Sequence, residues 1–430
     1  MKSGQVRFRT LSGAALAALA LPVAASAQTA VALDPISAAP LFRPDVAGTR
    51  SGPDRAEGIA VGGWILRPSA GFGALADSNV FNLPGDQADG DVAALQDARL
   101  DLSREEGARR FAMSLGVLNR VYASLPNQTT TDALARVGGI VPVGATELLS
   151  IGAEAARVTE PRGTGGLNFA EAGAVIYDSL RATGRLTHEG ARLRTEVALS
   201  AARRLYQDVD RRGAPDLKLG FRDVRVYAAD ARAAYYLTPA VALLALTRLD
   251  RTESLAPLPG LERDADGERV MAGARVAFGD LVVGEAAAGW TARQFTSPAF
   301  RDYGGPTAHV RLDWYPTPLV SYRLSADQDF ENSGLARVSA VLSRSAALVQ
   351  YWEALRTLTV VTRIGYSNDR FRELRIGTDS VAVSTGGAWR FRRDLSFTFD
   401  VSARRRWSSA PATVNAFHGI AANVGLKAAL

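Results

Sequence analysis

Charged side chains recur at every second position in several segments, and these residues have the types and spacing that could do chemistry. Arg192, Arg194 and Glu196, for example, alternate with Leu193 and Val197. Alternate residues of an extended strand point to the same face, so the charges share one surface. Such a surface could line a wet channel for anionic or sugar-like solutes. The alternative stays open that the charges are paired, solvated wall residues that only keep the surface hydrated.

Assigning the polar face of each clear alternating segment to one interior wall predicts a set of lumen-lining residues. They are Arg192, Arg194, Glu196, Arg204, Asp230, Arg232, Arg275, Arg293, Arg311, Asp313, Arg323, Asp327, Arg363, Arg390, Asp400 and Arg404. The same assignment adds Asp208, Glu285, Asp329, Asp369 and Arg406. Cations exceed anions slightly on this wall, which predicts a weak preference for anions.

The chain has three histidines, and an enzyme would need one of them within hydrogen-bond reach of a nucleophile. His188 falls in an expected turn, and His309 belongs to the expected polar wall. His418 is expected on the apolar face of the last strand, whereas Ser402 is expected on the polar face of its neighbour. We therefore predict no catalytic residues, and an enzyme is the third and least favoured function.

No cofactor or metal site is expected either. The chain has no cysteine, no histidine cluster and no phosphate-binding loop motif. Residues 264–268 resemble part of a calcium loop, but no ligand series follows them. An exposed turn is the better interpretation of this stretch.

The elements that position the charged residues are predicted to be strands. From Trp64 onward, apolar and polar residues alternate with period 2 in segments of about 10–16 residues, which is typical of a transmembrane β-barrel. In residues 395–406 every second residue is apolar, and the residues between are polar. Tyr227 and Tyr235 lie eight residues apart on one face, which is roughly 20 Å along the membrane normal for a tilted strand and close to the spacing of aromatic girdles.

Short turns alternate with longer loops along the whole segment. The expected turns lie at 103–108, 142–145, 187–190, 238–240, 279–281, 316–318, 353–356 and 392–394. The expected loops lie at 76–90, 124–131, 159–168, 208–219, 252–267, 296–304, 331–335, 368–376 and 408–412. Eight turns and nine loops predict about 18 strands in an all-β, antiparallel, up-and-down barrel with both ends in the periplasm. Val241–Leu246 and Val338–Leu348 alternate poorly, which leaves the number open by two.

The N-terminus carries the features of a secretory signal peptide: a basic start, an apolar stretch and a small-residue cleavage site ending at Ala27. We expect residues 1–27 to be cleaved, residues 28–63 to form an extended periplasmic segment, and residues 64–430 to form the barrel. Cleavage would remove three basic residues and leave 47 basic residues against 44 acidic residues. That small surplus gives no reason to expect a nucleic-acid partner.

Two stretches carry a resemblance to a known family. Residues 62–69 (Gly-Gly-Trp-Ile-Leu-Arg-Pro-Ser), followed by residues 77–81 (Asp-Ser-Asn-Val-Phe), resemble the start of the putative beta-barrel porin 2 family. Residues 314–319 (Trp-Tyr-Pro-Thr-Pro-Leu) are similar to a turn of that family. The resemblance implies an outer-membrane barrel without established catalytic residues, often linked to exopolysaccharide production and export. This chain ends in Leu430, where an aromatic residue is typical of such barrels.

We therefore expect a porin-like channel or exopolysaccharide-associated pore in the outer membrane of a Gram-negative bacterium, with a polar, mildly cationic lumen. The alternative is a non-conducting barrel that has a structural or partner-docking role. The expected partners are outer-membrane lipid and lipopolysaccharide, the barrel assembly machinery, and polysaccharide or small anionic solutes.

Overall fold

The computed structural model describes residues 58–162, 173–211, 214–333, 335, 337–411 and 414–430. The predicted signal peptide and residues 28–57 of the predicted periplasmic segment lie outside this part of the chain. No helix among the described residues is long and apolar enough to cross a membrane.

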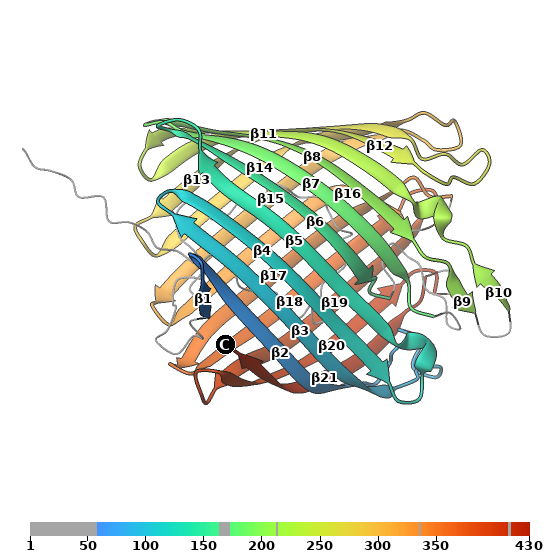
Figure 1. The fold of residues 1–430 in the computed structure, drawn as a ribbon. Coiled ribbons are helices and arrows are strands. Elements are labelled where there is room, and N and C mark those ends of the chain that lie inside the picture. Colours follow the sequence, from blue (N-terminus) through green and yellow to red (C-terminus); the bar gives the residue numbers. More distant parts are fainter. Residues whose placement is uncertain (1–57, 163–172, 212–213, 334, 336, 412–413) are drawn as a thin grey trace, which may run out of the picture.

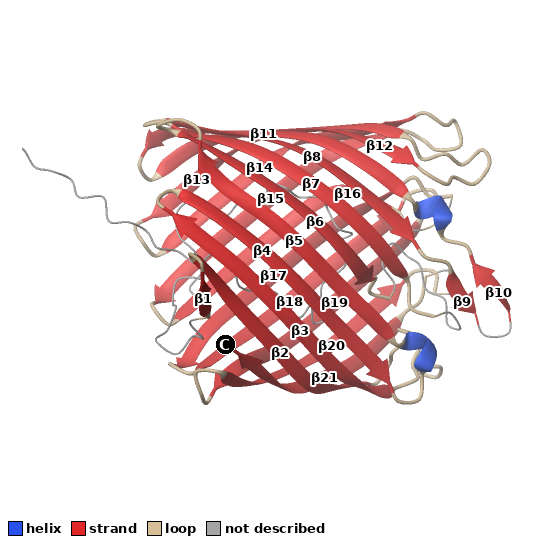
Figure 2. Ribbon diagram, in the orientation of Figure 1, coloured by secondary structure: helices blue, strands red, loops and turns tan. Residues whose placement is uncertain are grey.

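The described chain is built almost entirely of strands (Figure 2). They are β1 (Ile59–Val61), β2 (Trp64–Asp77), β3 (Asp91–Glu106), β4 (Arg109–Tyr122), β5 (Thr130–Pro142), β6 (Glu147–Thr159), β7 (Ile176–Glu189), β8 (Leu193–Tyr206), β9 (Val209–Arg211), β10 (Ala214–Leu217), β11 (Val224–Thr238), β12 (Val241–Ser254), β13 (Ala265–Phe278), β14 (Val282–Phe295), β15 (Tyr303–Thr317), β16 (Val320–Asn332), β17 (Ala340–Leu355), β18 (Leu358–Phe371), β19 (Ile376–Arg390), β20 (Leu395–Ser408) and β21 (Phe417–Ala429). Two short 3-10 helices, η1 (Pro126–Gln128) and η3 (Gly220–Arg222), lie in loops.

Eighteen of these strands form one closed antiparallel barrel (Figure 1). β2–β8 follow one another around the wall, β8 pairs with β11, and β11–β21 complete it. The barrel closes because β2 pairs with β21, from Ser69 opposite Ala429 to Asp77 opposite Ala421. The prediction of an 18-stranded, up-and-down barrel is confirmed.

The end with the short turns is the periplasmic end, by the usual arrangement of such barrels. The C-terminus and β1 lie at this end, and the β9–β10 hairpin lies at the other, which is therefore extracellular (Figure 1). All eight predicted turns are present, although β3 continues through Glu106 and shortens the first of them. The predicted loop 208–219 contains the β9–β10 hairpin, which the sequence did not predict.

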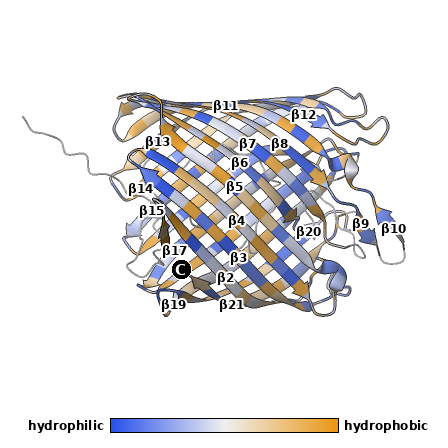
Figure 3. Ribbon diagram, viewed as in Figure 1, coloured by the Kyte–Doolittle hydropathy of each residue, from blue (hydrophilic) through white to orange (hydrophobic). Residues whose placement is uncertain are grey.

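Hydropathy alternates along the strands, as Figure 3 shows. On β8, Val197 and Leu199 are 49% and 63% exposed, whereas Ala198 between them is 2% exposed. Tyr227 and Tyr235, the two aromatic residues predicted to share a face of β11, are 43% and 45% exposed. A lipid-facing strand leaves such side chains unpacked by protein, so these exposed apolar residues mark the outer face.

β1 pairs with β2, from Ile59 opposite Leu66 to Val61 opposite Trp64. It therefore extends the sheet by a short hairpin within the last residues of the predicted periplasmic segment. Gly62 and Gly63 make the turn with φ values of +54° and +80°, a backbone conformation that glycine adopts at little cost.

Candidate channel interior

Charged residues line the inner face all around the barrel, whereas hydroxyl groups are concentrated on one part of it. Many of the arginine and acidic residues lie on β7–β16. The inner faces of β17–β20 carry many serine and threonine residues: Ser343, Ser345, Ser367, Thr378, Ser380, Ser384, Ser396, Thr398 and Ser402. β11 and β20 are nine strands apart in the ring of 18 and so lie across the interior from each other.

The most enclosed charges form a network on β11, β12 and β14. Arg248 pairs with Asp230 at 3.2 Å and with Asp250 at 3.6 Å. Asp250 also pairs with Arg293. Asp230 is 2% exposed, so it depends on Arg248 for the charge compensation that a buried carboxylate needs.

A second pair connects strands that are not neighbours. Arg232 of β11 and Glu285 of β14 approach to 2.6 Å, and their side chains are 7% and 14% exposed. β12 and β13 lie between these strands. The two side chains therefore reach over the intervening strands along the inner surface.

Further pairs continue around the wall on β15 and β16. Asp313 accepts hydrogen bonds from Arg311 at 2.8 Å and from Arg323 at 2.7 Å, so one carboxylate holds two guanidinium groups. Asp327 lies 2.6 Å from Nδ1 of His309. These contacts orient the charges along the wall and leave few of them available for strong binding to a single ion.

Near the periplasmic end, Arg194 pairs with Glu189 at 3.2 Å and Glu196 with Arg185 at 3.3 Å. Arg192 is placed differently from the prediction. It lies in the exposed turn before β8, and its backbone carbonyl accepts a hydrogen bond from Tyr236. β8 thus begins at Leu193, one residue later than predicted, and Arg192 directly precedes it.

The other predicted residues lie at scattered points of the inner face. Arg204 stacks over the Tyr177 ring at 5.9 Å, and Arg275 is 6% exposed. Arg363 interacts electrostatically with Asp400. Arg390 is the last residue of β19, at the periplasmic end.

Arg404 connects the wall to the extracellular loops. It pairs with Asp77 at 2.8 Å and donates to the carbonyl of Asn79 and to the side chain of Asn82, at 2.8 and 2.9 Å. Asn82 adopts a φ of +53°, which asparagine tolerates better than most residues. Arg404 thus fixes a tight turn of the β2–β3 loop.

The sequence prediction missed Arg248, Asp250, Arg185 and Asp77. Arg248 and Asp250 follow a stretch whose alternation is weak, because the inner face of β12 also carries Leu244, which is 4% exposed. Because apolar residues occur on both faces of this part of β12, the alternation of apolar and polar residues is not visible in the sequence. The signal that could have found these two residues is their own alternation with Leu249, which is 57% exposed.

The extracellular loops contact one another through buried arginines. Arg263 of the β12–β13 loop donates to the carbonyl of Ser333 at 2.6 Å and to those of Leu335 and Val338 in the β16–β17 loop. The same guanidinium lies 5.3 Å from the centre of the Phe300 ring in the β14–β15 loop. Burial lowers the pKa of Arg263 to about 10.

A comparable contact lies farther around the rim of the barrel. Arg162 lies 4.8 Å from the centre of the Phe81 ring and donates to the carbonyl of Gly173 at 3.1 Å. Burial lowers its pKa to about 10 as well. Arg222 of η3 binds both carboxylate oxygens of Glu160, at 3.0 and 3.1 Å. The loops therefore hold one another in place at the extracellular opening.

The histidines do not assemble with a nucleophile within the described chain. His188, which was expected in a turn, lies in β7 near its periplasmic end and contacts Glu147 at 2.9 Å. Ser402 is 3% exposed on the inner face, whereas His418 is exposed on β21 opposite Arg405. Nor do the described His, Asp and Glu residues form a group of three or more that could hold a metal ion.

The family model described as putative beta-barrel porin 2 matches residues 52–428. The chain belongs to this family. The resemblance expected from the stretches near residues 62–81 and 314–319 is thus confirmed, and so is an outer-membrane, porin-like barrel. No curated protein matches the sequence.

Several solved outer-membrane proteins are similar to the chain in fold. OccK2 (OpdF) of Pseudomonas aeruginosa shares 13% identity with a TM-score of 0.46, over 85% of this chain and 97% of that one. OpdK of the same species, solved with vanillate, shares 12% identity with a TM-score of 0.43, over 85% and 99%. The FrpB iron transporter from Neisseria meningitidis shares 9% identity with a TM-score of 0.49, over 89% and 83%.

Proposed function

We propose that this porin-family barrel is a passive channel for small, polar, mildly anionic or sugar-like solutes. The observation that carries the proposal is the inner wall, where the paired charges of β11–β16 lie next to the hydroxyl-rich strands β17–β20. A hydroxyl wall offers donors and acceptors without a strong field, and arginine binds carboxylates well. Weak contacts of both kinds suit a solute that must enter and also leave.

The link to exopolysaccharide that the family resemblance implies belongs to this proposal. Guanidinium and hydroxyl groups along one lumen would suit a polymer of hydroxylated, partly acidic sugars. A short uronic-acid oligosaccharide should therefore block ion current more strongly than a neutral oligosaccharide of the same length.

A second function, a non-conducting barrel that docks a partner, is favoured by the extracellular loops. Arg263, Arg162 and Arg222 fasten these loops to one another near the opening. Loops held in this way could restrict the passage of solutes and present a rigid surface to a partner.

Planar-bilayer recordings of the refolded barrel test both functions. A channel gives stable conductance steps and, under a salt gradient, a reversal potential that indicates weak anion preference. The preference should grow at low salt, because screening by ions shortens the reach of the wall charges to ~8 Å at physiological salt. Absence of conductance would reject the channel and favour the docking barrel.

A further inference from the structure

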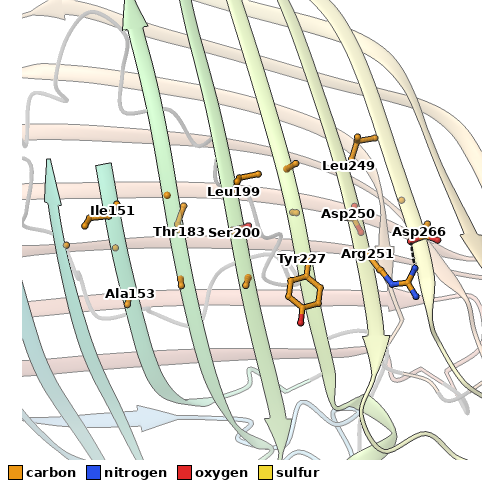
Figure 4. Close-up of a pocket in the computed structure, with 18 of the residues that line it drawn as sticks. Ile151, Ala153, Thr183, Leu199, Ser200, Tyr227, Leu249, Asp250, Arg251 and Asp266 are labelled. Carbon is orange, nitrogen blue, oxygen red and sulfur yellow. Dashed lines mark ion pairs between the residues drawn. The ribbon is translucent and has the colours of Figure 1, made fainter. Parts of the chain in front are cut away.

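A long groove crosses the outer face of the barrel, away from the channel. Its lining comes from β4–β8 and β11–β14, and its volume is about 1220 Å³. Figure 4 shows part of it, including Ile151, Leu199, Tyr227 and the ion pair of Arg251 with Asp266.

Strand register explains the course of the groove. One row of directly paired residues runs across the wall: Val137, Ala153, Ala182, Ala201, Tyr227, Arg251, Asp266 and Gln294. The adjacent row on the same face contains Gly139, Ile151, Gly184, Leu199, Ala229, Leu249, Glu268 and Ala292. Eight strands at ~4.8 Å spacing make each row on the order of 34 Å long.

The side chains give the groove a low floor and raised edges. From β6 to β11 the floor consists of small residues, namely Ala153, Ala182, Gly184, Ala201 and Ala229, and a Cβ added at Gly184 would meet nothing within 4 Å. Ile151, Leu199 and Leu249 project between them and are 58%, 63% and 57% exposed. The lining becomes polar toward β14, where it includes Arg251, Asp266, Glu268 and Gln294. A trough of this shape on a lipid-facing wall fits an extended hydrocarbon chain.

Two arginines face each other beside the groove, one row nearer the extracellular end. Arg203 of β8 is the direct cross-strand partner of Arg225 of β11. Like charges directly opposite each other destabilise a sheet. The carboxylate of Glu253 is 3.7 Å from Arg225, but it also lies 3.3 Å from Arg251. Asp223 interacts electrostatically with Arg203, but its carboxylate already accepts a 2.7 Å hydrogen bond from the backbone N–H of Tyr206.

We infer that this groove binds a phosphorylated glycolipid of the outer leaflet, with an acyl chain along the floor and a phosphate between Arg203 and Arg225. Arginine suits phosphate because its donors bind two oxygens at once. A phosphate there would remove the repulsion between the two guanidinium groups. Both residues lie near the extracellular ends of their strands, which is the depth at which the headgroups of that leaflet lie.

The direct test measures lipid binding to the refolded full-length barrel by native mass spectrometry in detergent. The probes are bisphosphorylated lipid A, the same molecule without phosphates, and phosphatidylglycerol. We expect lipid A to bind at least tenfold more tightly than its dephosphorylated form. Equal binding of all three would overturn the inference, because the arginines would then have no role. Equal binding of lipid A and phosphatidylglycerol alone would overturn the assignment to a glycolipid.

Variants separate the two parts of the site. Arg203→Gln with Arg225→Gln should remove the phosphate preference and weaken lipid A binding roughly tenfold, as expected for loss of charge-assisted contacts. Gly184→Leu with Ala201→Leu should fill the groove and weaken both forms of lipid A alike. Arg405→Gln is the matched control, since Arg405 stacks on Trp407 at 4.7 Å on β20, far around the barrel.

Two results would reject the proposed occupant even if the variants fold normally. One is an equal loss of binding in Arg405→Gln and in the Arg203 and Arg225 double variant, which would indicate nonspecific attraction. The other is a dimer of the barrel that the groove-filling variant abolishes, which would make a second copy of this chain the occupant. Heat-modifiable mobility on gels confirms in each case that the variant is folded.

Discussion

Arg232 and Glu285 form a 2.6 Å ion pair inside the barrel although two strands separate them in the sheet. Their side chains cover the inner face of β12 and β13 and place one positive and one negative charge side by side on the wall. Because the two charges are paired, neither dominates the local electric field. Removing either side chain would leave the charge of the other uncompensated.

Replacing Glu285 or Arg232 should therefore change selectivity in opposite directions. Glu285→Gln leaves an uncompensated guanidinium and should increase anion preference, whereas Arg232→Gln should reduce it. The measurement is the reversal potential under a salt gradient. Each substitution should lower the free energy of unfolding by less than the roughly 3–5 kcal/mol that is lost when an ion pair is broken in a dry core. The loss is smaller because lumen water can reach the remaining charge. Shifts of the same sign in both variants would contradict this account.

The assignment of inner and outer faces can be tested on β20. Phe399→Arg places a charge in the lipid and should reduce the free energy of unfolding by about 2–4 kcal/mol. Thr398→Arg faces the interior, where its neighbour Asp400 also points, and should cost far less. Urea unfolding in lipid vesicles measures both. Similar losses in the two variants would show that the faces are assigned wrongly.

The closure of the barrel can be tested with introduced cysteines, because the chain has none of its own. Ala74 and Val424 are direct partners across the β2–β21 seam. Ala74→Cys with Val424→Cys should form an intramolecular disulfide on mild oxidation, visible as altered mobility on denaturing gels. Ala70→Cys with Val424→Cys is the control, since four residues along a strand separate the two by about 13 Å, too far for a disulfide. Equal crosslinking in the two variants would contradict the register.

The contact between the β12–β13 and β16–β17 loops should control access to the opening. Arg263→Ala removes three hydrogen bonds to the β16–β17 loop and should raise single-channel conductance. It should also speed tryptic cleavage after Arg337, which is exposed in that loop. Arg301→Ala, an exposed position in the neighbouring loop, is the control for loss of a loop arginine. If both the conductance and the rate of cleavage were unchanged, this contact would not restrict access to the extracellular opening.

The strand number and the faces could be predicted because each depends on local sequence. A strand with one face in lipid and one in water must alternate, and its ends carry turn residues. β12 shows the limit, since Leu244 on its inner face obscured Arg248 and Asp250. The start of β8 shows another, since the strand begins at Leu193, one residue after the predicted Arg192.

The contacts among loops could not be predicted from local patterns. Arg404 reaches Asn82 across 322 residues of sequence, and Arg263 reaches Leu335 across 72. Such contacts depend on which loops meet around the rim, and that follows from closure of the whole barrel. Local patterns also could not predict the ion-pair partners of inner charges that lie on strands that are not neighbours, as in the pair of Arg232 with Glu285.

The seam between β2 and β21 has a consequence for assembly. It joins the first and the last barrel strands, so the backbone donors and acceptors of β2 that face β21 have no partner until the final strand is inserted. In hydrocarbon each unsatisfied group costs several kcal/mol, and a chain lacking its last thirteen residues would keep two open edges. Both edges must therefore be shielded from hydrocarbon until β2 and β21 pair, so the energetic penalty of an incomplete barrel ends only when the last strand is in place.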